Sequence, residues 1–96
     1  ESQVILNGSY NINFTMDLVL KDTGLFDDLA KKLGAPLEIS PKIVEIFKDG
    51  QKKYGSRAWS SMIVKRMEDI NKIDFRANGF PEELTDNEPE EKGYEI

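Results

Sequence analysis

The segment from Phe14 to Leu33 has the periodicity of a helix with large apolar residues on two opposite sides, and this feature constrains the fold most. At about 100° per residue, one apolar face lies within about 60° of Leu18. It consists of Phe14, Leu18, Leu25, Leu29 and Leu33. Met16 and Leu20 lie on the opposite side. A helix that is apolar on two sides needs cover on both, and two further short helices cannot easily supply it. We therefore expect a second copy of the chain, or another part of the same polypeptide, to complete the packing.

The apolar spacing predicts an all-α fold with three main helices, over residues 14–33, over residues 41–54, and from after Ser56 to about Ile73. Residues 1–13 fit either a frayed helix end or a short strand. Beyond the third helix the periodicity stops, and proline, glycine and acidic residues predominate. The sequence therefore predicts a helical domain over 1–73 and an irregular acidic tail over 74–96.

Glycine, proline and serine mark the expected helix ends. Gly34 stands where a left-handed residue ends the first helix, and Pro36 prevents its continuation. Ser40 is the expected N-cap of the second helix, with Pro41 at its first position. Gly55 is expected to end that helix.

Two groups of side chains on the second and third helices have ordinary structural explanations. An apolar stripe at helical spacing is expected to be core: Trp59, Met62, Ile63 and Met67. Basic residues gather around the joint between the two helices and are expected to form a solvated face: Lys48, Lys52, Lys53, Arg57, Lys65 and Arg66.

Composition excludes several classes of function. The 96 residues fit one domain. The chain contains no cysteine and no histidine, so it has no thiolate and lacks the commonest general base and metal ligand. We therefore expect no metal site, no hydrolase triad and no zinc enzyme in this chain.

Charge and hydropathy argue against two classes of partner. The net charge is −5, and residues 74–96 contain eight acidic and two basic residues. An acidic chain without interleaved aromatic residues is a poor nucleic-acid binder, so we expect no nucleic-acid partner. No apolar stretch reaches the roughly 18 residues of a membrane span, so we expect no membrane partner. The lack of cysteine is compatible with the cytoplasm, which is the expected location.

Two charged residues of the first helix are candidates for a functional site. Asp22 falls within the Leu18 face, where burial of its carboxylate is costly without hydrogen-bond donors. The more frequent explanation is that Asp22 binds backbone amides of a neighbouring segment, while Lys21 extends from the edge of the face to water. The alternative is that Lys21 points into a ligand cleft and Asp22 fixes the helix beside it.

Three short motifs occur along the chain in the same order as in a known protein family. They are LKDTGL at 20–25, LGAPL at 33–37 and GSRAWSS at 55–61. This order resembles the C-terminal domain of β-hydroxyacid dehydrogenases, such as 3-hydroxyisobutyrate dehydrogenase and tartronate semialdehyde reductase, over about residues 1–73. Thr23 and Phe26 stand where the family usually has leucine and alanine, and Ala58 stands where it commonly has an acid.

The resemblance implies the three-helix C-terminal part of a domain like the C-terminal domain of 6-phosphogluconate dehydrogenase, without its long interdomain helix. The full-length enzyme would transfer hydride between NAD or NADP and a small β-hydroxyacid, whereas this part alone would be inactive and bind no cofactor. The family's catalytic lysine would lie upstream, so no catalytic residue is expected here. Lys21 would contact the cofactor and Asp22 would support it. The implied partners are the enzyme's own N-terminal nucleotide-binding domain and a second subunit.

A second class of function explains the unsatisfied apolar face without an enzyme. On this hypothesis the chain is a small helical interaction module that associates with itself through that face. Both hypotheses predict self-association, so a dimer alone does not discriminate between them.

Overall fold

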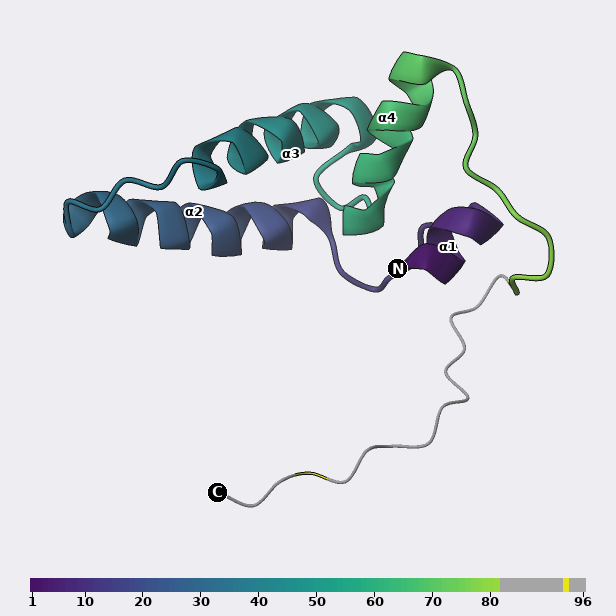
Figure 1. Cartoon of the computed structure of the whole chain (residues 1–96), viewed down its shortest axis with the longest axis horizontal. Helices are drawn as coiled ribbons and strands as arrows, with labels where there is room; N and C mark the ends of the chain where they lie inside the picture. The colour runs from purple at the N-terminus through teal and green to yellow at the C-terminus, as the bar shows by residue number, and fades with distance from the viewer. Residues whose placement is uncertain (82–92, 94–96) are drawn as a thin grey trace.

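The computed structural model describes residues 1–81 and residue 93, and these residues form an all-α structure, which confirms the predicted class (Figure 1). Its elements in chain order are α1 (Ser2–Asn7), α2 (Met16–Lys32), α3 (Ser40–Tyr54), the short 3₁₀ helix η1 (Ser60–Met62) and α4 (Ile63–Asn71). The N-terminal segment, for which helix and strand were both open, is helical. No helix within residues 1–81 is both long and apolar enough to cross a bilayer. Most of the predicted tail lies outside the described residues.

Helices α2 and α3 form an antiparallel hairpin, with α4 and α1 at its open end (Figure 1). Gly34 turns the chain after α2 with φ of 67°, in the left-handed region that favours glycine. The Ala35 amide then donates to the Ala30 carbonyl at 2.9 Å, which closes the end of the helix. Gly55, with φ of 99°, ends α3. Both glycine ends agree with the prediction.

The start of α3 differs from the prediction, because Ser40 is the first helical residue rather than the N-cap. Ile39 already has helical torsion angles (φ −98°, ψ −40°). Its carbonyl accepts the amides of Lys42 and Ile43 at 2.9 and 3.1 Å. The helix therefore begins one residue earlier, and the buried hydroxyl of Ser40 has no hydrogen-bond partner among the described residues.

The third predicted helix starts later than Ser56, because the preceding segment pairs with the beginning of α2. The amides of Met16 and Asp17 donate to the carbonyls of Ala58 and Ser56 at 2.9 and 3.0 Å. These bonds satisfy amides that the first turn of a helix leaves unpaired. The segment before η1 is therefore a turn that ends in the extended residue Trp59, and α4 begins only at Ile63.

The buried interior is small and unusually polar. Its hydrophobic members are Val4, Tyr10, Met16 and Ala30, and its polar members are Thr15, Asp27, Ser60, Ser61 and Glu68. Three helices meet at Gly50, where an added Cβ would lie 2.9 Å from Ile63 Cδ1 and 3.2 Å from Met16 Sδ. The absence of a side chain at this glycine therefore allows the close approach of α2, α3 and α4.

A buried carboxylate joins α4 to the segment that follows α1 and to the segment that follows α4 itself. The side chain of Glu68 has no exposed surface. Its Oε1 atom accepts the Tyr10 hydroxyl at 2.7 Å, and both carboxylate oxygens lie 3.2 Å from Arg76 Nη1. Arg76 also donates to the Tyr10 hydroxyl at 2.7 Å and stacks over the ring at 5.2 Å from its centroid. Burial, followed by the hydrogen bond to Glu68, raises the pKa of Tyr10.

Candidate functional site

Helix α2 packs against the rest of the fold with its Met16 side. The side with the longer apolar stripe, around Leu18, faces away. Its buried residues are Met16, Asp27 and Ala30. Met16 lies against Gly50 of α3, which has no side chain. The sequence predicted that both sides of this helix need cover; within the described chain, close packing of Met16 against Gly50 covers one side and leaves the other open.

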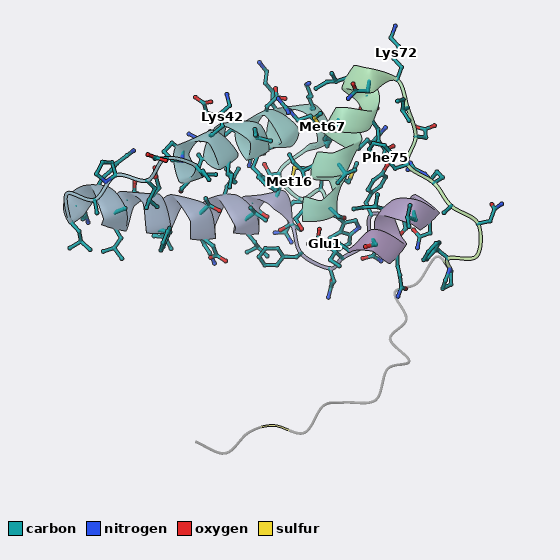
Figure 2. All side chains as sticks on the ribbon, in the orientation of Figure 1. Glu1, Met16, Lys42, Met67, Lys72 and Phe75 are labelled. Atoms are coloured by element: carbon teal, nitrogen blue, oxygen red, sulfur yellow. The ribbon has the colours of Figure 1, made fainter. Side chains whose placement is uncertain are left out.

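The other side of α2 is an open apolar face, which we define by Leu18, Leu25, Leu29 and the C-cap residue Leu33; Phe14, which was expected on this face, precedes the helix. Leu25 is 63% exposed, Leu29 53% and Leu33 72%, while Phe14 and Leu18 are each more than a third exposed. Figure 2 shows side chains projecting from the side of α2 that faces away from α3. A continuous exposed patch of this kind is typical of an interaction surface.

Lys21 and Asp22 lie at this open face and are both well exposed. Their charged atoms, Lys21 Nζ and Asp22 Oδ1, are 3.8 Å apart, and the two side chains are 62% and 65% exposed. The expected burial of Asp22 among apolar side chains is therefore wrong, since the face to which it belongs is open. Both charges are available to a ligand or a partner.

A shallow groove of about 880 Å³ adjoins the open face near the α2–α3 turn. Its walls come from α2, the connecting segment and the start of α3: Asp22, Thr23, Phe26, Pro36, Leu37, Glu38, Ile39, Ser40 and Ile43. Most of this lining is apolar, and the two carboxylates are at its surface. The groove thus extends the apolar surface around the end of the hairpin.

Three of the basic side chains between α3 and α4, those of Lys53, Lys65 and Arg66, pair with acids of the same helices. Arg66 Nε donates to Asp49 Oδ2 at 2.6 Å, and Lys53 Nζ lies 3.3 Å from the same oxygen. The hydrogen bond from Arg66 is the main reason that the pKa of Asp49 is lowered. Lys65 pairs with Asp69 at 3.0 Å. These pairs neutralise part of the basic surface between the two helices.

The Tyr54–Asp69 hydrogen bond should make stability fall at alkaline pH. The Tyr54 hydroxyl donates to Asp69 Oδ2 at 2.6 Å, and burial together with this bond raises the pKa of Tyr54 from 10.0 to about 12. The protonated hydroxyl therefore contributes fully below pH 10, and its contribution is lost as the pH rises to about 12. Urea unfolding across this interval should show a smaller loss of stability for Tyr54→Phe than for the unchanged chain. Lys65 titrates in both proteins, so its contribution cancels when their pH dependences are compared. Equal slopes of the free energy of unfolding against pH in the two proteins would contradict the prediction.

No family model, no curated protein and no solved structure matches this chain. Within residues 1–81 and 93, no three acidic side chains come together in a way that could hold a metal ion. The exposed charged pair, the open face and the adjoining groove are therefore the features that carry a functional argument.

The sequence prediction missed the polar interior and part of the exposed surface. Glu68 lies on the side of α4 opposite the apolar stripe, yet it is the buried residue of that helix. Met67 was expected in the core but is 47% exposed. A buried carboxylate gives no periodic signal, because its partners Tyr10 and Arg76 come from distant positions.

Proposed function

We propose that this chain is a small helical interaction module that associates with itself through the open apolar face of α2. The observation that carries the proposal is the exposure of large apolar side chains on one side of a 17-residue helix, namely Leu18, Leu25 and Leu29, together with Leu33 at its C-cap. Such a helix is about 25 Å long, which gives enough surface for pairing with a second helix. Covering these side chains in a complex removes apolar surface from water at about 25 cal/mol per Å².

Replacing Leu29 by glutamate should weaken this association by about tenfold or more, because a charge then enters the apolar contact in both copies. Sedimentation equilibrium of the whole chain measures the dissociation constant. The matched control is Ile70→Glu on α4, because Ile70 is 55% exposed and Leu29 53%. The control should leave the constant unchanged. A chain that remains monomeric up to millimolar concentration would remove the proposal.

A second candidate is a nicotinamide-dependent β-hydroxyacid dehydrogenase of which this chain is the C-terminal part. The specific observation in its favour is the exposure of Lys21 at the edge of the open face, where a cation can reach a ligand held between two domains. In this proposal the interdomain helix of the enzyme covers the open face, and the substrates are NAD or NADP and a small β-hydroxyacid.

The test of this candidate is reduction of NAD and NADP by the intact polypeptide with a panel of small β-hydroxyacids. Lys21→Ala should lower kcat/KM by at least about tenfold, because the variant loses a cation that orients the cofactor. Lys42→Ala is the control, since Lys42 is 73% exposed on α3. Turnover that is indifferent to Lys21→Ala would remove the role of this lysine, and absence of turnover would remove the enzyme candidate.

A further inference from the structure

Two opposite charges interrupt the open apolar face of α2. Asp22 and Lys32 lie about 40° on either side of the line through Leu18, with Leu25 and Leu29 between them. The two charged residues are ten positions apart, which corresponds to about 15 Å along the helix. Within the described part of the chain, Lys32 forms no ion pair, and Asp22 has only the exposed contact with Lys21. The face therefore carries one acid and one base at opposite ends of a leucine pair.

We infer that two copies of the chain pair through α2 in antiparallel orientation, with Asp22 of each copy facing Lys32 of the other. This inference rests on the proposed self-association and adds its partner orientation. An antiparallel pair centred on residue 27 brings both charge pairs together. The same arrangement places Leu25 opposite Leu29 of the second copy, so apolar and charged positions match at the same time.

Other arrangements of the same two helices do not match both sets of residues. In a parallel pair in register, Asp22 meets Asp22 and Lys32 meets Lys32, and like charges oppose that orientation. An antiparallel pair shifted by one heptad brings Leu18 opposite Leu29, but it places Asp22 against Leu25 of the second copy. A carboxylate against leucine loses water without gaining a partner. The charges thus act as determinants of orientation and register.

Disulfide trapping can test the orientation, because the chain contains no native cysteine. Chains with Leu25→Cys and Leu29→Cys are mixed under mild oxidation, above the concentration at which the wild-type chain self-associates. In the proposed pair, only the mixed 25–29 combination brings Cα atoms within the roughly 7 Å that a disulfide needs. Mixed disulfides should therefore form at least about tenfold faster than 25–25 or 29–29 disulfides, whose Cα atoms are offset by about four residues.

Reversal of the charges tests the role of the two charged residues. Asp22→Lys alone and Lys32→Asp alone should each weaken self-association by about tenfold, because each creates two like-charge contacts per pair. The chain with both substitutions should recover the wild-type dissociation constant to within about twofold, since the reversed charges again face each other. Lys42→Asp on α3 is the control and should have no effect. Circular dichroism establishes that each variant keeps its helices.

The outcomes separate this inference from the proposed function. A wild-type chain that never self-associates overturns both. Self-association that produces mainly 25–25 and 29–29 disulfides, or that is indifferent to charge reversal, overturns the antiparallel pairing and leaves the proposed function standing. Preferential 25–29 disulfides together with recovery in the doubly substituted chain support the pairing.

Discussion

Replacing Glu68 by alanine should reduce the free energy of unfolding by about 4 kcal/mol, because removal of one member of a buried ion pair leaves its partners unsatisfied. The substitution removes the acceptor of the Tyr10 hydroxyl and the counter-charge of Arg76. It also leaves a cavity at a site with no exposed side-chain surface. Small domains are typically stable by about 5–15 kcal/mol, so a large part of the stability would be lost.

Urea unfolding followed by circular dichroism measures this effect. The matched control is Glu45→Ala, because Glu45 also lies in a helix and forms an ion pair, with Lys42, but its side chain is 70% exposed. That substitution should cost less than about 1 kcal/mol, which is typical of surface pairs. Comparable losses in the two variants would show that the Glu68 network contributes no more than a surface contact.

Met16→Ala should reduce the free energy of unfolding by about 3 kcal/mol, which is typical of a large side chain truncated in a packed interior. Met16 has no exposed surface and is among the largest fully buried side chains. It lies at the beginning of α2, where α2, α3 and α4 meet beside Gly50 (Figure 2). Its removal therefore weakens the contact of three helices at once.

Met67→Ala is the control for this substitution, since Met67 is on α4 and is 47% exposed. Thermal unfolding of the two variants should show a much larger decrease of Tm for Met16→Ala. Equal shifts would indicate that α2 is held mainly by other contacts. The comparison also tests whether the inward face of α2 is the one with Met16 rather than the one with Leu29.

The positions of α2 and α3 could be predicted from sequence, because apolar spacing and glycine ends are local signals. Gly34 and Gly55 end their helices as expected. The inward face of α2 could not be predicted, since periodicity identifies two apolar sides without ranking them. The small residue Gly50, which lies on another helix, decides that Met16 packs inward.

The candidate site could be predicted only in part. Lys21 and Asp22 were identified from their position on an apolar helix face, and the structure places them together at the surface. Their roles toward a cofactor stay predictions. The Glu68 network could not be found from local pattern, because it unites residues 58 positions apart through a buried hydrogen bond.

Because Arg76 forms an ion pair with the buried Glu68, a stable unit of this chain must extend at least to Arg76. Arg76 follows α4, and the next residue, Ala77, donates its amide to the Leu6 carbonyl at 3.0 Å. A chain cut after Ile73 would keep every helix found within residues 1–81 and yet lose the cation that compensates a buried carboxylate. We therefore expect the smallest unit that folds alone to extend beyond α4. It includes the short non-helical segment with Arg76 and Ala77, which contacts α4 and α1.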